Sequence, residues 1–300
     1  MSTAVAEARS TVEGPPLRTK RKRWTAYILP VFTVAMIVYL ASPVFIMILF
    51  SFNKLTGQRQ IAKFTCCTLT WWSEMFAIPA LNEALRTSIL VAIPAALIAT
   101  ALGALIGLVL GRYRFQGRGL TNFVIFLAIA IPEIVLASSL LSMFVLGKAP
   151  LGYGSILFSH IGFAIAFVAI TVRARVQGLD RSLENAAQDL FATPFQAFTK
   201  VTLPLILPGV VAGFLLAFVL SLDDFVITDF VGGAENTFPT WVFGATRIGM
   251  PPQVNVWGTI LFSAGLLTAG LNLVSSFRAS RKSEAAASAA NASLRGATGA

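Results

Sequence analysis

The sequence predicts an all-α membrane protein with six transmembrane helices. Hydrophobic residues make up 56% of the 300 positions and charged residues only 12%, whereas soluble domains carry about 25% charge. The mean hydropathy is +0.77. Six stretches are long enough to cross a bilayer, which takes about 20 apolar residues per helix. Because these stretches are apolar throughout and do not alternate, they are not barrel strands.

The charged residues delimit the six spans. Five of the stretches contain no Asp, Glu, Lys or Arg, and the third along the chain contains only Glu133. They are 24–53, 87–111, 119–147, 149–172, 201–222 and 248–277. The first is too long for the apolar region of a cleaved secretory signal, which spans about 7–15 residues. We therefore expect a transmembrane domain over 24–278, between a basic tail (1–23) and an Ala/Ser-rich tail (279–300) that are both disordered.

The basic residues orient the predicted bundle. Seventeen of the 23 Lys and Arg residues lie in residues 1–23, in the 112–118 and 173–200 loops and in residues 278–300. Positive charge accumulates in cytoplasmic loops, so both termini are expected in the cytoplasm. The net charge of +10 is then mainly a topology signal, and it does not indicate binding to nucleic acid.

Three glycines follow one another at four-residue spacing in the second span, at Gly103, Gly107 and Gly111. Small residues at this spacing allow two helix backbones to approach closely in lipid. The pattern predicts a close helix contact, and it fits a contact with a second subunit and packing inside the bundle equally well.

Four acidic residues lie in or near the spans: Glu133, Asp223, Asp224 and Asp229. A charge at the bilayer centre costs about 2.5–3.5 kcal/mol on insertion scales, so such residues usually face a cavity or a partner. No Lys or Arg occupies the middle of a span, which favours a pathway for cations. The alternatives are pairing with a second subunit and, for Asp229, solvation at the interface.

The only histidine, His160, is expected to form hydrogen bonds between helices. One histidine and two adjacent cysteines do not provide a metal cluster, so no metal is expected.

The polar loop 174–204 is too long for a simple turn. The pattern over 182–190 predicts an amphipathic helix with Leu183, Ala186, Ala187 and Leu190 on one side. Thr193-Pro194 then begins a second helix, with Thr as N-cap and Pro at the first position, and Leu203-Pro204 is expected to end it. Two short helices bent at 191–193 would present an apolar face to a groove on a partner.

Two parts of the sequence resemble a known family. The run Leu183–Pro194, followed by Phe198, Val201 and Leu203-Pro204, resembles the EAA loop of ABC-importer permeases. The runs Pro132–Leu136 and Ser221–Ile227, followed by Phe238-Pro239 and Arg247-Ile248-Gly249, resemble the spermidine/putrescine branch. The resemblance extends over about 25–277 and implies a type I importer-like permease of the bacterial inner membrane.

The resemblance also implies partners. Cytoplasmic coupling helices would contact a dimer of ABC ATPases, which carries MgATP, while a second permease of a homologous, different chain and a periplasmic substrate-binding protein complete the importer. ATPase coupling would fall on Glu184, Asn185, Ala186, Ala187, Asp189, Leu190, Phe191 and Ala192.

This chain departs from the EAA pattern at two positions. Asn185 stands where the family usually has glutamate, and Phe191 stands where it usually has glycine. Glycine at a bend supplies a positive φ, which a bulky residue adopts only at a cost. Either the bend is made differently here, or the ATPase groove accommodates a ring.

The sequence contains no G-x-x-x-x-G-K-[ST] phosphate loop, so we expect that this chain does not bind ATP in that manner. The resemblance implies that a separate ATPase subunit hydrolyses ATP, and we therefore expect no cofactor and no enzymatic activity on this chain. A permease for another small amine-bearing solute is an alternative. So is an ion-coupled secondary transporter or channel that uses Glu133 or the Asp223/Asp224 pair. An intramembrane enzyme has little support, because a serine nucleophile would have only His160 as a base.

Overall fold

The computed structural model describes residues 25–54, 64–65, 67–180, 182–268 and 270. The tails predicted at 1–23 and 279–300 lie outside these residues. The chain forms two compact units, one from residues 54–254 and the other from 1–53 together with 255–300.

The smaller unit contains α2 (Thr25–Ser51) and most of a helix over 253–268. Most large side chains of α2 are apolar and exposed, which is typical of a helix that faces lipid. The two helices touch closely at Gly258, where an added Cβ would lie 2.7 Å from the Met47 sulfur.

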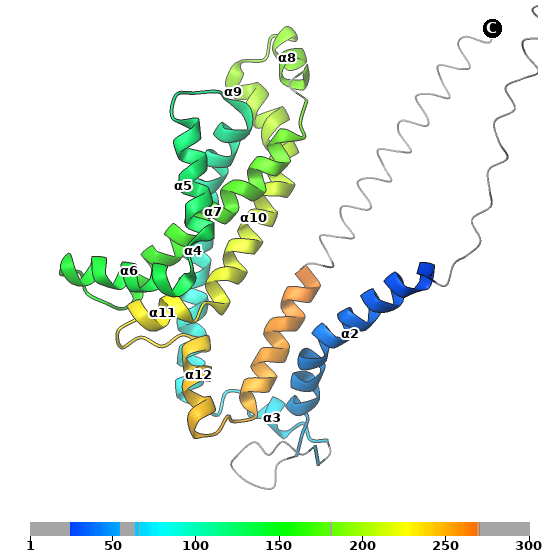
Figure 1. The fold of residues 1–300 in the computed structure, drawn as a ribbon, viewed down its shortest axis with the longest axis vertical. Coiled ribbons are helices and arrows are strands. Elements are labelled where there is room, and N and C mark those ends of the chain that lie inside the picture. Colours follow the sequence, from blue (N-terminus) through cyan, green and yellow to red (C-terminus); the bar gives the residue numbers. More distant parts are fainter. Residues whose placement is uncertain (1–24, 55–63, 66, 181, 269, 271–300) are drawn as a thin grey trace, which may run out of the picture. The chain divides into compact units, whose positions relative to one another are not determined.

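Three long helices form the centre of the larger unit: α4 (Pro79–Arg112), α7 (Tyr153–Gln177) and α10 (Leu203–Asp223). They pack side by side along most of their length (Figure 1). Small and β-branched side chains fill the space between them, which brings the backbones close together. The buried cluster consists of Ala96, Ala99, Ala164, Val168, Val172, Val176, Ile206 and Ala217.

The glycine ladder of α4 faces α7 inside the bundle. A Cβ added at Gly103 would lie 2.7 Å from the Val168 Cβ, and one at Gly107 would lie 2.6 Å from the Ala169 carbonyl oxygen. One at Gly111 would lie 2.6 Å from Val176. Real Cβ atoms do not approach this closely, so α4 and α7 meet as they do because these residues are glycines. Of the two interpretations of the ladder, packing inside the bundle is therefore correct.

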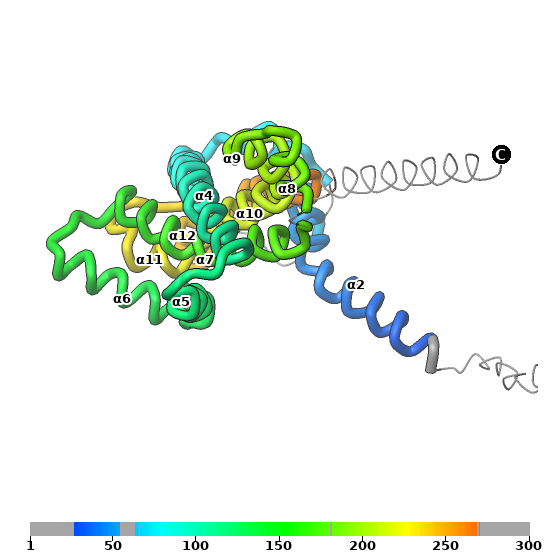
Figure 2. The backbone as a smooth tube through the Cα atoms, turned by 90° about the horizontal axis from the view of Figure 1, so that it is seen from above, coloured from blue at the N-terminus to red at the C-terminus, as the bar shows by residue number. Residues whose placement is uncertain are grey.

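The third predicted span is not one continuous helix, contrary to expectation. It consists of α5 (Arg118–Ala130) and α6 (Glu133–Leu146), which meet at an angle of 106°. Pro132 lacks an N–H and forces the residue before it out of the helical region, and Ile131 is indeed extended at φ −66° and ψ 130°. As a result, α6 extends sideways from the three long helices in both views (Figures 1 and 2).

The polar loop folds into the two predicted short helices, α8 (Ser182–Asp189) and α9 (Pro194–Ala197), at one end of the bundle. Thr193 caps α9, as expected, because its hydroxyl accepts a hydrogen bond from the Gln196 N–H. Asp180 accepts one from the Ser182 N–H at the start of α8, and this contact with Ser182 lowers the pKa of Asp180.

The prediction that Leu203-Pro204 ends the second short helix is wrong. The helix continues from α9 through a π-helical segment, η1 (Phe198–Thr202), into α10, so that Pro194–Asp223 is one helix of 30 residues. The Leu203 N–H bonds to the Phe198 carbonyl, five residues back. The π-helical hydrogen bonds therefore allow the helix to continue past Pro204, although this residue has no N–H to donate.

Three short helices complete the larger unit: α3 (Thr70–Ser73), α11 (Val226–Val231) and α12 (Phe238–Ile248). The α11 helix packs against α6 and α7, in a second buried cluster built around Val91, Ile156, Ile227 and Val231.

Among the described residues, four helices are long and apolar enough to cross a membrane, or five if the bent pair α5–α6 counts as one span. The four are α2, α4, α7 and the helix that contains α10. The sixth predicted stretch, 248–277, contains the helix 253–268 and then runs partly outside the described residues.

We expect Gly107→Ala to destabilise the bundle by about 1–3 kcal/mol, because the new methyl group meets backbone atoms of α7 and forces the helices apart. The midpoint of thermal unfolding in detergent micelles measures the effect. Gly162→Ala on α7 is the matched control, because nothing lies within 4 Å of its added Cβ. Equal midpoints for the two variants would contradict the close contact.

Candidate functional site

Three of the four predicted acids meet where α10 ends and α6 begins. Asp223 is the last residue of α10, Asp224 follows it with extended backbone, and Glu133 is the first residue of α6. Asp223, Asp224 and His160 all lie close enough to Glu133 to interact with it electrostatically. The bend at Pro132 creates this grouping, because it turns Glu133 from mid-span into a helix N-terminus. Asp229 lies further along α11 and is exposed.

His160 connects α7 to the break between α10 and α11. Its Nδ1 lies 2.7 Å from the Ser221 hydroxyl, and its Nε2 lies 3.0 Å from Asp224 Oδ2 and 3.1 Å from the Thr228 hydroxyl. Because a carboxylate only accepts, Nε2 donates to Asp224, while Nδ1 forms a hydrogen bond with the Ser221 hydroxyl, which can both donate and accept. The expected hydrogen bonds of His160 between helices are thus confirmed.

The carboxylate of Asp224 accepts several hydrogen bonds from within the protein. Besides His160, its carboxylate accepts from the Ile227 N–H at 3.3 Å and from the Thr228 N–H and hydroxyl at 2.9 Å each. Asp224 lies just before Phe225, the N-cap residue of α11, and its carboxylate thus satisfies two N–H groups in the first turn of that helix. It is buried, whereas Asp223 and Glu133 are exposed. The two adjacent aspartates consequently differ: one is held by the fold, and its neighbour is open to other groups.

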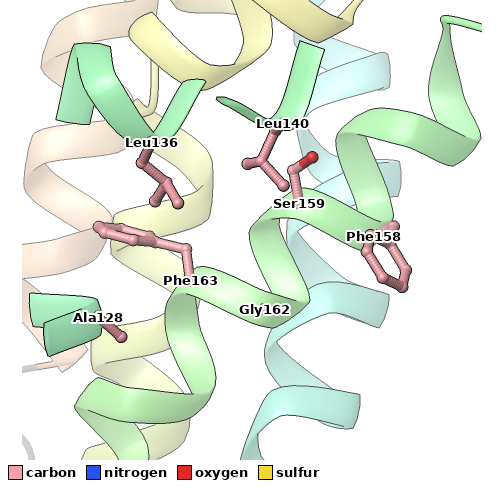
Figure 3. A pocket seen from close by; sticks show the side chains of 7 residues that line it. All are labelled: Ala128, Leu136, Leu140, Phe158, Ser159, Gly162 and Phe163. Carbon is pink, nitrogen blue, oxygen red and sulfur yellow. The ribbon is translucent and has the colours of Figure 1, made fainter. Parts of the chain in front are cut away.

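An apolar cavity of about 130 Å³ lies in the angle between α5, α6 and α7 (Figure 3). The figure shows the side chains of Leu136, Leu140 and Phe163 around it, with the Ser159 hydroxyl as the polar group of the lining. The lining offers almost no ligands for a cation, because the Ser159 hydroxyl is its one polar side-chain group.

At the bend between α8 and α9 the backbone has the conformation that glycine usually adopts, although the residue there is a phenylalanine. Phe191 has φ +63°. Its N–H donates to the Gln188 carbonyl and the Ala192 N–H to the Ala187 carbonyl, which is the Schellman pattern with Phe191 in the usual glycine position. The left-handed conformation costs a residue with a Cβ about 1–2 kcal/mol. Of the two possibilities stated above, the bend is therefore not made differently: Phe191 adopts the backbone conformation that the usual glycine would adopt.

The tip formed by α8 and α9 is apolar and exposed. The exposed fractions are 82% for Leu190, 96% for Phe191 and 74% for Phe195. The predicted coupling residues Asn185, Ala186 and Asp189 are also exposed, while Ala187 and Ala192 are half-buried. A surface of this kind commonly contacts another protein.

Glu184 differs from its neighbours because it faces the bundle. Its Oε2 lies 2.6 Å from Arg112 Nη1 at the end of α4, and its Oε1 accepts a hydrogen bond from the Thr202 hydroxyl. The sequence analysis counted Arg112 only as a topology signal. No pattern in the sequence pairs two residues that lie 72 positions apart.

A protein-family model matches residues 103–279, which contain both the acidic group and the polar loop; it describes the binding-protein-dependent transport system inner membrane component. The chain belongs to this family of transport permeases. The polyamine permease PotC of the spermidine/putrescine transport system of Escherichia coli K12 is 37% identical over 237 residues, which are 79% of this chain and 89% of PotC. PotI, of the putrescine transport system of the same organism, is 35% identical over 75% of this chain and 82% of PotI.

Solved permease chains share the fold. A chain from a bacterial transporter that imports the polysaccharide alginate has a TM-score of 0.60 at 16% identity, covering 87% of this permease and 98% of that chain. A chain of the MetNI methionine transporter has a TM-score of 0.54 at 18% identity, covering 66% and 93%. The all-α fold of this permease is therefore that of ABC importer membrane subunits.

We expect Asp224→Ala to destabilise the permease by about 2–3 kcal/mol, because buried donors of His160 and Thr228 would lose their acceptor. Asp223→Ala, the adjacent exposed carboxylate, should leave the thermal unfolding midpoint in detergent close to that of the unsubstituted protein. An equal decrease of the unfolding midpoint in the two variants would contradict the different structural roles of the two aspartates.

Proposed function

We propose that this chain is the permease subunit of an ATP-driven importer that carries polyamine cations across the bacterial inner membrane. The observation that carries the proposal is the match with PotC and PotI over about three quarters of the chain. The exposed carboxylates of Glu133 and Asp223 support the same cargo, because a polyamine presents ammonium groups separated by short methylene segments.

The proposed topology has six spans and both termini in the cytoplasm. The described helices supply up to five spans, and the stretch 248–277 supplies the sixth. The predominance of basic residues in the tails and in the 112–118 and 173–200 loops supports this orientation.

The complete importer needs three kinds of partner. A dimer of ABC ATPases, with MgATP bound to it, would supply the energy. A second permease, homologous but different, would form the other half of the pathway, and a periplasmic binding protein would deliver the cargo. Among the structural neighbours, the alginate transporter has been solved together with a periplasmic protein that holds its cargo.

Glu133 and Asp223 are the proposed contacts for the cargo. Both are exposed where α10 ends and α6 begins, and a carboxylate there offsets the cost of bringing an ammonium group into a low-dielectric pathway. Asp224 would hold this geometry through its bonds to His160 and Thr228. Asp229, exposed further along α11, would attract the cargo from a greater distance.

The tip formed by Leu190, Phe191 and Phe195 is the proposed docking surface for the ATPase. Its exposed apolar side chains need a partner that covers them. Closure of the two ATPases on MgATP would then displace α8 and α9 and switch the bundle between its inward- and outward-open states.

The function is tested by uptake of radiolabelled spermidine and putrescine into cells from which this chain has been deleted. We expect uptake to be lost on deletion, restored by the intact chain, and retained when the proton gradient is collapsed. Uptake that strictly requires the proton gradient would contradict an ATP-driven importer and favour a secondary transporter.

We expect Glu133→Gln and Asp223→Asn each to lower spermidine uptake at limiting concentration by about tenfold, which corresponds to about 1.4 kcal/mol of lost attraction. The ATPase should still co-purify with both variants. Glu83→Gln, an exposed carboxylate on α4 outside the acidic group, is the matched control. Loss of assembly together with uptake would instead indicate that these acids pack against a second subunit.

Phe191→Ala and Phe191→Gly separate the ring of this residue from its backbone strain. Both variants lose the ring, so both should retain about tenfold less ATPase during purification from membranes. Only glycine relieves the left-handed backbone, so Phe191→Gly should unfold at a higher temperature than Phe191→Ala, by about 1 kcal/mol in stability. Undiminished ATPase retention in both variants would remove Phe191 from the docking surface.

A further inference from the structure

One carboxylate joins three helical segments at the end of the bundle that carries the docking surface. Glu184 belongs to α8, and its Oε2 lies 2.6 Å from Nη1 of Arg112, the last residue of α4. Its Oε1 accepts a hydrogen bond from the hydroxyl of Thr202, the last residue of η1 and the one before α10. Both oxygens of Glu184 therefore point toward the bundle.

Arg112 depends on this contact because it is buried. Its side chain is only 8% exposed, and its Nε has no hydrogen-bond partner among the described residues. A guanidinium that leaves water needs a carboxylate and well-placed acceptors to compensate for its lost solvation. Glu184 provides that carboxylate, and Thr202 is buried beside it. The pair is thus far more firmly held than an exposed ion pair, which contributes little.

Other connections of α8 to the bundle are weak. No residue of α8 is buried, and the chain on its far side passes through the bend at Phe191. On its near side lies the turn at 178–180. A displacement of α8 could be absorbed by these two bends and would then never reach the long helices. The contacts of Glu184 prevent this, because they tie α8 directly to the ends of α4 and α10.

We infer that the Arg112–Glu184 pair is a latch that transmits displacement of α8 to α4 and α10. In this role Glu184 is a positioning residue that acts within the permease, although the EAA resemblance groups it with the residues that contact the ATPase. The inference rests on the proposed function, in which the ATPase displaces α8. The exposed tip binds the ATPase, and the Arg112–Glu184 pair transmits the resulting movement of α8 to the spans.

The test uses the complete importer, reconstituted in proteoliposomes with its ATPase, second permease and binding protein. Two quantities are measured for each variant: ATPase retained with the permease during purification, and ATP hydrolysed per spermidine transported. The variants are Arg112→Gln, Glu184→Gln and the double exchange Arg112→Glu with Glu184→Arg. Arg114→Gln is the matched control, because Arg114 is an exposed arginine two residues from Arg112.

We expect both single variants to retain the ATPase but to consume at least about fivefold more ATP per spermidine, the lower end of typical coupling between sites. The double exchange should recover much of the loss, because it restores one positive and one negative charge. Arg114→Gln should match the unsubstituted importer. A role of the pair in fold stability alone would lower the amount of importer without changing the ratio of ATP to spermidine.

Three results would contradict this role of the pair. The first is an unchanged ratio of ATP hydrolysed to spermidine transported in properly assembled single variants. The others are loss of ATPase retention in Glu184→Gln and a double exchange with the same ratio as the single variants. Loss of retention would make Glu184 a direct contact with the ATPase. Should the unsubstituted permease fail to bind any ABC ATPase, the proposed function would fail first, so the two failures can be told apart.

Discussion

The close contact between α4 and α7 is the constraint on which the rest of the larger unit depends. At Gly103 and Gly107 the α7 backbone or side chains occupy the place of a Cβ, so the two helices can hold only one register and spacing. Apolar surfaces do not drive helices together in lipid, and association relies on such close packing. With this pair fixed, α10 fills the remaining groove through Ile206 and Ala217, and the ends of all three helices acquire defined positions.

At one end of these three helices, their packing determines which acidic residues are buried and which are exposed. Because α7 is fixed against α4, His160 lies where it can bond Asp224 just beyond α10. That contact, together with the capping of α11, immobilises one aspartate and leaves Asp223 exposed. Pro132 acts at the same place by ending α5 and bringing Glu133 toward the group. Packing of ordinary apolar helices thus decides which carboxylates remain available.

How far the sequence could predict this arrangement depends on the range of each interaction. The presence of α4, α7 and α10 and the starts of the short helices α8 and α9 follow from local rules. The positive φ at residue 191 does not, because a phenylalanine stands where a glycine would have indicated it. The bend before Glu133 was also signalled locally by Pro132, but the length of the apolar run favoured a continuous span. The difference between Asp223 and Asp224 and the pairing of Arg112 with Glu184 were not predictable, because each depends on residues brought together from distant helices.

The arginines at the α8 end show how one residue type serves two purposes. Beyond their charge, which favours the cytoplasm, Arg118 bonds the Leu110 carbonyl, Arg173 bonds Asn122 and Arg175 bonds the Leu205 carbonyl. These bonds tie α5 to α4, α7 to α5 and α7 to α10, so the helix ends form one connected layer. The α10 helix extends about 30 Å from this layer to Asp223, and a helix is stiff over that distance. A small tilt imposed at the arginine layer therefore displaces the acidic group as well, although no side chain links the two ends directly.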